Sequence, residues 1–476
     1  MAKTKKLAAT KKHPLLEAAN GIMIKNVPSY GNKFFYSLGF LSMITFFMLI
    51  LTGVVMTFFG PNWWLTNPVG SYIRSVHLWS TQAFVVFIIL HGLIVFFTSG
   101  FKKPRRLSWV LGVLMLFVVL AETEFGYVLR GDFSSQWRGL QGADFYNGGG
   151  LGWYLNPLNY RQIYGVHIVI IPFVIISLLF LHYVLVRVLG IAKPYRKDVN
   201  VKTVPANHKK LFARAGGLIV TILLLAVFLP SPYIKSTTIQ SVAQEDPVLV
   251  GKTLVSEFDN SSDTSTYMDN IDPYKFAARN IFIANPYQQY LQTQSIPKDY
   301  MKIFNAEPKQ LQDDQLKAVS DYFDQDKPDA NKAPSNPVMS VIVSLSNMAK
   351  AGLYEPALAG SGNSGTLNDG STYVERFLSD TGVLEGKATI LNITTDQYGM
   401  IREEKGNTPG AWWLAPIGVL NHTVLKNTDN GDRDAAIIFG SLILTLLAFP
   451  FIPYINQIPD KLKVYRLIWG EKKRKY

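Results

Sequence analysis

Four histidines lie inside long apolar segments of this 476-residue chain, and they form two pairs of nearly equal spacing. His91 follows His77 by 14 residues, and His182 follows His167 by 15 residues. An α-helix completes a turn in ~3.6 residues and rises ~1.5 Å per residue, so both members of a pair face nearly the same way, ~21 Å apart. Two such helices facing each other offer two stacked His–His sites.

A histidine buried in hydrocarbon is rare and needs a partner. For one isolated histidine, a packing role is the better interpretation. Four in register instead favour two haem irons, each held by two axial imidazoles, with one haem near each membrane surface. The predicted metal ligands are therefore His77, His91, His167 and His182.

Four glycines repeat the histidine interval in two further apolar segments. Gly39 and Gly53 are 14 residues apart, and so are Gly112 and Gly126. Because glycine has no side chain, a bulky flat group can approach the helix backbone closely there. We therefore expect these glycines to contribute to cofactor binding at two depths.

The composition predicts a membrane protein, since 48% of the residues are hydrophobic and 17% are charged. We expect an all-α membrane protein, with a di-haem four-helix bundle, two further transmembrane helices and an extracytoplasmic insertion. Each expected span is near the ~20 residues that a bilayer needs. The spans are 34–58, 75–98, 108–129, 162–189, 214–231 and 435–454.

The net charge of +13 could indicate nucleic-acid binding, but the basic clusters fall on one side of the six expected spans. We therefore predict a multi-pass plasma-membrane protein with both termini in the cytoplasm, and no nucleic-acid partner. The predicted parts are a cytoplasmic segment with an interfacial helix (1–33), the di-haem core (34–195), a cytoplasmic loop with the fifth span (196–231), the extracytoplasmic insertion (232–434), and the sixth span with a basic tail (435–476).

The chain contains no cysteine. It can hold no iron–sulfur cluster through cysteine and no haem attached through Cys-x-x-Cys-His, so any haem is non-covalent.

Several of these segments together resemble a known family, the cytochrome b subunit of quinol-oxidising cytochrome bc complexes, including its chloroplast-like and Gram-positive versions. The resemblance is strong over residues 30–195 and weaker over the fifth and sixth spans. The segments that carry it are Ile73–Trp79, Phe101–Gly112, Gly126–Leu129, Arg161–His167 and His182–Gly190.

The resemblance implies two haem b groups, quinone as substrate, and electron transfer in a homodimeric complex with a Rieske-type iron–sulfur subunit, a c-type cytochrome and membrane lipids. It implies that His77 and His167 hold the outer haem and that His91 and His182 hold the inner one. It also implies that Arg74 pairs with a haem propionate. The alternative for Arg74 is an interfacial side chain that snorkels to water.

The chain departs from the family at the outer quinol site. The family's Pro-Glu-Trp-Tyr has no counterpart, and the nearest segment, Pro409–Trp413, lacks the glutamate. Where the family usually has Pro-Trp after Gly-Tyr-x-Leu, this chain has Arg130-Gly131-Asp132, and Ile94 replaces a frequent arginine.

Two pairs of acids are candidates to replace the missing glutamate as a proton acceptor. Glu122 and Glu124 lie near the outer end of the third span, where the alternative is a solvated helix end. Glu403 and Glu404 precede Pro409, and there we expect ordinary surface residues. Glu124 is the first choice.

The remaining polar segments are less specific. On the inner side, Asn32, Lys33 and His208 are candidates either for bordering a quinone or for binding lipid headgroups. A helix within 307–323 faintly resembles the last helix of a cytochrome c domain, without implying a haem. The insertion shows no nucleophile–base pair, phosphate loop or metal-ligand cluster, so we expect it to dock a partner subunit.

The sequence thus predicts the cytochrome b-type subunit of a respiratory quinol:electron-acceptor oxidoreductase, incomplete alone. The alternative is a di-haem membrane anchor or electron conduit for another redox enzyme, without a bifurcating outer quinol site. A structural or transport protein on the same scaffold is disfavoured by the four retained histidines.

Overall fold

The computed structural model describes most of the chain. The predicted interfacial helix at 14–27 lies almost wholly outside the described residues, as do Glu404 and the basic tail. The described ranges are 25–152, 154–191, 202–271, 276–295, 298–362, 369–403, 408–428 and 431–469.

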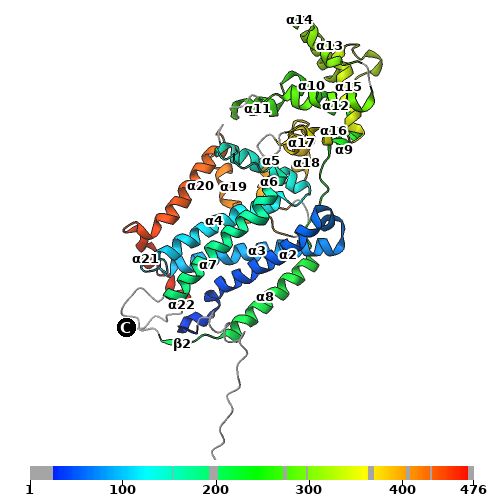
Figure 1. The fold of residues 1–476 in the computed structure, drawn as a ribbon. Helices are drawn as coiled ribbons and strands as arrows, with labels where there is room; N and C mark the ends of the chain where they lie inside the picture. The colour runs from blue at the N-terminus through cyan, green and yellow to red at the C-terminus, as the bar shows by residue number, and fades with distance from the viewer. Residues whose placement is uncertain are drawn as a thin grey trace, which may run out of the picture.

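Within these ranges, six helices are long and apolar enough to cross a membrane, which confirms the all-α membrane fold. They lie side by side in the lower part of Figure 1. Large apolar side chains on their outer surface, such as Phe173 (71% exposed), would meet lipid. The helices are α2 (Leu38–Thr66), α3 (Pro68–Phe97), α4 (Arg106–Val128), the continuous helix Tyr160–Leu189 that includes α6 (Tyr160–Gly165) and α7 (Ile171–Leu189), α8 (His208–Phe228), and Arg433–Phe451, largely α20 (Gly431–Ala448).

The loop expected at 59–73 is wrong, because almost all of this stretch is helical. α2 bends at Gly60, whose φ of 74° suits glycine, and Pro61 follows. α3 then begins at Pro68, with the Asn67 side chain accepting hydrogen bonds from two backbone amides. An Asn cap followed by proline is a strong helix start, so the connection shrinks to one residue.

Two short elements tie the chain ends together at the far end of the bundle. β1 (Asn26–Pro28) pairs antiparallel with β2 (Thr203–Pro205). The Nζ of Lys33 donates to the carbonyl oxygen of Trp469 at 2.6 Å, and Asn32 donates to Pro205 at 3.1 Å. Asn32 and Lys33 thus have structural roles, and their place beside a quinone stays a prediction.

The insertion forms a helical unit with its own apolar core, above the bundle in Figure 1. α5 (Phe133–Gly148), which follows α4, contributes Phe133 and Trp137 to this core. The Trp137 indole also donates to the carbonyl of Ile393 at 2.8 Å, so the insertion is packed onto the bundle through α5. Its larger helices are α9 (Ile239–Glu245), α10 (Pro247–Asp259), α11 (Asp263–Ile271), α12 (Asn285–Gln294), α13 (Tyr300–Ala306), α14 (Lys309–Phe323), α15 (Pro337–Lys350), α16 (Tyr354–Gly360), α17 (Gly370–Asp380) and α18 (Val383–Ile390).

A buried pair of carboxyl groups joins α10 to α17 inside the insertion. Burial raises the pKa of Glu257 well above its usual value, and its hydrogen bond with Asp380 raises it further. Burial also raises the pKa of Asp380. Ser262 donates to Glu257 at 2.9 Å, and the Thr264 amide donates to Asp380 at 2.9 Å. The two acids therefore share a proton in the folded state.

This pair predicts that the insertion is more stable at acidic pH. Because the folded state holds the proton more tightly than the unfolded chain, the stabilisation is complete below ~pH 4 and is lost as the pH rises through the raised pKa. Glu257→Gln should flatten this dependence and stabilise the insertion at pH 8 by roughly 1–2 kcal/mol, measured by thermal unfolding of the full chain. The exposed Asp326→Asn is the control and should leave the dependence unchanged.

Candidate metal centres and the adjoining polar site

Each of the four predicted ligand histidines faces a glycine on the neighbouring helix. A Cβ atom added to the glycine would lie 3.1 to 3.7 Å from the Cε1 atom of the imidazole. Two of the pairs join α2 to α3, and two join α4 to the helix Tyr160–Leu189. The pairs are Gly39–His91, Gly53–His77, Gly112–His182 and Gly126–His167.

The structure brings His77 and His167 together at the outer level. Both line one cavity of about 230 Å³, together with Gly53 and Gly126. His91 and His182 also lie close enough to interact electrostatically. The arrangement is the two-level stack that the sequence predicts.

A π-helical turn, η3 (Val166–Ile170), surrounds His167. A π-turn holds more residues than an α-turn, so it absorbs the extra residue in the 15-residue interval between His167 and His182. Such single turns recur at functional sites. The unequal spacing of 14 and 15 was the sequence signal for it.

Hydrogen bonding assigns the tautomer of His77. The hydroxyl of Thr52 donates to the carbonyl of Met48 at 2.8 Å, which uses its proton. The same oxygen lies 2.8 Å from Nδ1 of His77, so it accepts the Nδ1 proton. The Nε2 atom is then left with a lone pair, as a metal ligand requires.

His167 has a carboxylate in the corresponding place. Its Nδ1 atom lies 3.1 Å from Oε1 of Glu122, although outside good hydrogen-bond alignment. A carboxylate beside the non-ligating nitrogen orients a metal-bound imidazole and makes it more basic. Glu122 is thus placed to position His167, and it also lines the outer cavity.

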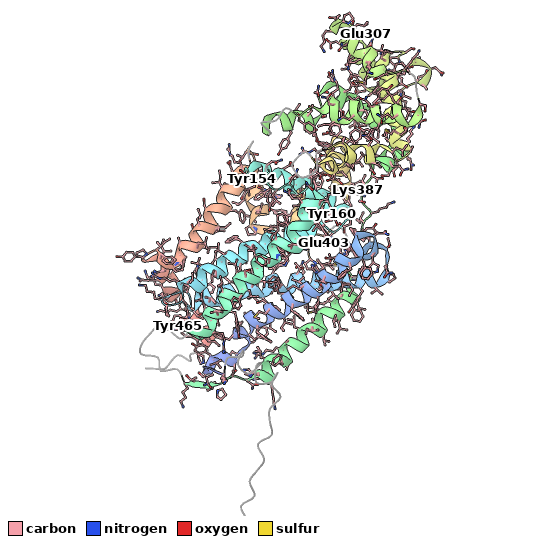
Figure 2. The ribbon with its side chains drawn as sticks, in the orientation of Figure 1. Tyr154, Tyr160, Glu307, Lys387, Glu403 and Tyr465 are labelled. Carbon is pink, nitrogen blue, oxygen red and sulfur yellow. The ribbon has the colours of Figure 1, made fainter. Side chains whose placement is uncertain are left out.

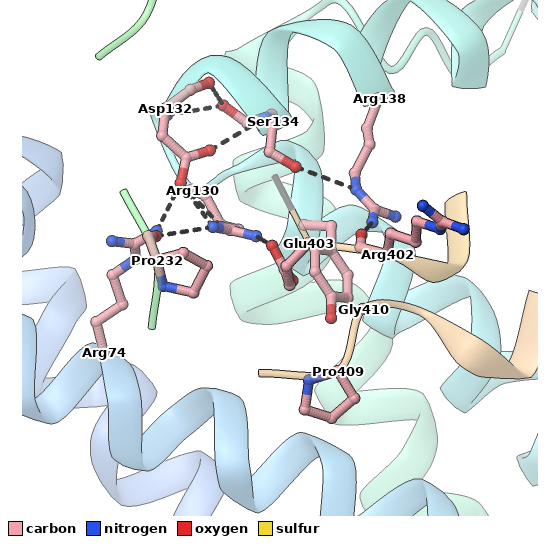
Figure 3. Close-up of polar contacts among 12 residues, drawn as sticks. Arg74, Arg130, Asp132, Ser134, Arg138, Pro232, Arg402, Glu403, Pro409 and Gly410 are labelled. Carbon is pink, nitrogen blue, oxygen red and sulfur yellow. Dashed lines mark hydrogen bonds and ion pairs between the residues drawn. The ribbon is translucent and has the colours of Figure 1, made fainter. Parts of the chain in front are cut away.

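Two arginines and two acids form a buried network at the rim of this cavity (Figure 3). Asp132 accepts from Arg74 at 2.6 Å and from Arg130 at 2.9 Å. Arg130 also pairs with Glu403 at 2.7 Å. Both arginines donate to the carbonyl of Pro232. Buried charges need such partners, so the network fixes the start of the insertion against α3.

This network corrects two expectations. Arg74 is 6% exposed, so it does not snorkel to water. The side chain of Glu403 is 1% exposed, so it is not a surface residue. The sequence gave no sign of this pairing, because Arg130 and Glu403 are 273 residues apart. A propionate contact of Arg74 stays a prediction.

The segment Pro409–Trp413 lies against α3 and is held by one side chain, Gln82. The Gln82 amide nitrogen donates to the carbonyls of Pro409 at 3.0 Å and Gly410 at 3.1 Å. Its oxygen accepts from the Trp412 indole at 2.8 Å. Sequence analysis missed Gln82, although a buried amide five residues after His77 in an apolar span is itself a functional signal.

The same segment reaches Glu124 on α4. The Trp413 indole donates to Oε1 of Glu124 at 3.1 Å. Trp413 also packs against Tyr127, with ring centroids 6.2 Å apart. Residues two apart on a helix point in different directions, so Glu122 faces the cavity while Glu124 faces the 409–413 segment. The two acids therefore serve different surroundings.

Comparisons with known proteins agree with this geometry. A family model described as "Cytochrome b(N-terminal)/b6/petB" matches residues 82–143 and 154–247. Cytochrome b6 of Heliobacterium modesticaldum is 34% identical over 192 residues, covering 35% of this chain and 89% of that protein. Cytochrome b6 of Mastigocladus laminosus is 29% identical over 201 residues, covering 37% of this chain and 92% of that protein.

The chain belongs to the cytochrome b6 family. The predicted family is thereby confirmed, and with it a multi-pass membrane protein of a redox complex. The family match ends at residue 247, so most of the insertion lies beyond it. A solved structure described as "Hyperthermophilic respiratory Complex III" aligns over 94% of this chain and 98% of that chain, with 14% identity and a TM-score of 0.42, too low to carry an argument.

The Gln82 contacts predict that one substitution releases the 409–413 segment. Gln82→Leu keeps the bulk but removes hydrogen bonds that each contribute ~1 kcal/mol. The backbone amides of Trp412 and Leu414 should then exchange hydrogen for deuterium roughly tenfold faster or more. Gln141→Leu, which removes one exposed hydrogen bond to Thr395, is the control. Equal exchange in both variants would contradict this anchoring role.

Proposed function

We propose that this chain is the cytochrome b-type subunit of a respiratory quinol:electron-acceptor oxidoreductase, which carries electrons across the membrane between two non-covalent haem b groups. The observation that supports it is the contact of four histidines with four glycines at two levels of the bundle. Both features are what a flat cofactor with two axial ligands needs: nitrogen donors and open backbone.

The residues fit a haem at the outer level. The cavity is mainly apolar, His77 presents Nε2, and the buried Arg74 and Arg130 lie at its rim, where propionate carboxylates would need positive charge. At the inner level, the Nδ1 of His182 is buried without a hydrogen-bond partner among the described residues. When bound, haem supplies a reversible one-electron centre at each level.

The chain's own residues provide a proton acceptor on the outer side. Quinol releases protons as it is oxidised, so a base must lie within hydrogen-bond reach. Glu124 meets the 409–413 segment through Trp413, and it thus approaches from α4 the place that the family fills with its own glutamate. Glu403 is already paired with Arg130, which makes it a poorer acceptor.

The alternative is a di-haem conduit without a bifurcating outer site. The absence of glutamate in Pro409–Trp413 favours it, as does the closure of that segment onto Gln82. In either case the next electron carrier is another chain, because this one has no cysteine for an iron–sulfur centre. A co-purifying Rieske subunit and sensitivity to outer-site quinol inhibitors would decide for the first function. An outward-facing insertion that docks such a partner remains part of this proposal.

The histidine pairing predicts selective loss of one haem. His91→Ala or His182→Ala should remove the inner haem and lower the haem content of the purified chain from two to about one. The outer haem should stay at least partly bound. Haem extracted by acid acetone and counted per chain measures this result. The surface variant Lys209→Ala is the control. A wild-type chain with one haem or none would refute the proposal.

The two acids of α4 should differ in their effects. Glu124→Gln should slow quinol-dependent haem reduction by tenfold or more, in the ~10²–10⁴ range of general-base losses or just below it, without displacing haem. Glu122→Gln should instead change the spectrum or potential of the outer haem, because it weakens the support of His167. Stopped-flow reduction and redox titration separate the two. Unchanged reduction rates would remove Glu124 from the mechanism.

A further inference from the structure

A basic pocket lies at the end of the bundle opposite the insertion, the end where Tyr465 is labelled in Figure 2. It has a volume of about 520 Å³ and lies between the α3–α4 connection and the chain after α20. α4 begins at Arg106, and the last membrane span ends at Phe451. The pocket therefore lies where two spans leave the hydrocarbon, at the level of lipid headgroups.

The charge of the pocket is strongly unbalanced. Its lining has five basic side chains and one acid, Asp460, which is already occupied by Lys102 and by the Ser99 hydroxyl. The Nε of Arg106 is buried and has no hydrogen-bond partner among the described residues. The basic residues are Lys102, Lys103, Arg106, Lys461 and Lys463. Such a set of donors suits the oxygens of a phosphate group.

An apolar rim borders these cations. Several large apolar side chains that directly precede or follow lining residues are exposed, and Phe451 also stacks under the Arg106 guanidinium at 5.1 Å. A free phosphate ion would gain nothing from this rim, whereas acyl chains would cover it. The rim residues are Leu107, Phe451, Ile455, Ile458 and Leu462, each 41–56% exposed.

We propose that this pocket is a binding site for the phosphate headgroup of an anionic phospholipid, whose acyl chains lie on the apolar rim. The lipid then joins the α3–α4 connection to the segment after α20. This role is independent of the haem proposal, because none of the lining residues belongs to the histidine sites.

Native mass spectrometry of the purified full-length protein tests the site, with dioleoyl phosphatidylglycerol as the probe. Lys103→Gln, Lys461→Gln and Lys463→Gln combined should reduce lipid retention by about tenfold or more. The control combines Lys202→Gln, Lys209→Gln and Lys210→Gln, which remove the same charge from exposed sites at the same end of the bundle. Its retention should stay within about twofold of wild type.

Three results would overturn the proposal: equal loss in both triple variants, equal retention of phosphatidylcholine, or displacement of the lipid by millimolar inorganic phosphate. If the glutamine variant does not fold, photo-crosslinking decides instead. A phosphatidylglycerol with a photoreactive acyl chain should label wild-type peptides covering Leu107 and 451–462, and labelling elsewhere would contradict the site.

Discussion

The close approach of imidazole rings to glycine backbone is the constraint on which the rest of this structure depends. At four places a histidine of one helix lies against a glycine of the next, with room for little more than a hydrogen. A larger residue at Gly126 would push into His167 at 3.1 Å and change the distance between α4 and its neighbour. The helices are therefore spaced by what must fit between them, in two layers.

Polar contacts then bring distant parts of the chain back to this bundle. Asp132 joins Arg74 of α3 to Arg130 after α4, and through Arg130 to Glu403 at the end of the insertion. Gln82 holds the next segment by its backbone carbonyls. Buried charges and amides are costly unless paired, so these contacts specify one return path for the chain after the long insertion. In this way an unrelated domain is accommodated without disturbing the histidine levels.

The periodic features of the sequence predicted most of what depends on periodicity. The six apolar segments, the histidine pairs and the matching glycines are all local patterns, and each is where the structure needs it. The contacts of Gln82 and Glu403 were not predictable, because they depend on pairing across 273 to 330 residues. The kink at Gly60 and the one-residue connection to α3 were missed because Asn67-Pro68 starts a helix where polar residues suggested a loop.

The central claim is that one chain holds two bis-histidine haems at two depths, and the iron positions test it most directly. A cryo-EM map of the purified protein should show two flat densities within the bundle of α2, α3, α4 and α7. Their irons should lie ~21 Å apart, the rise of 14 helical residues. One should join His77 to His167, and the other His91 to His182. A single density, or irons held by other residues, would contradict the account.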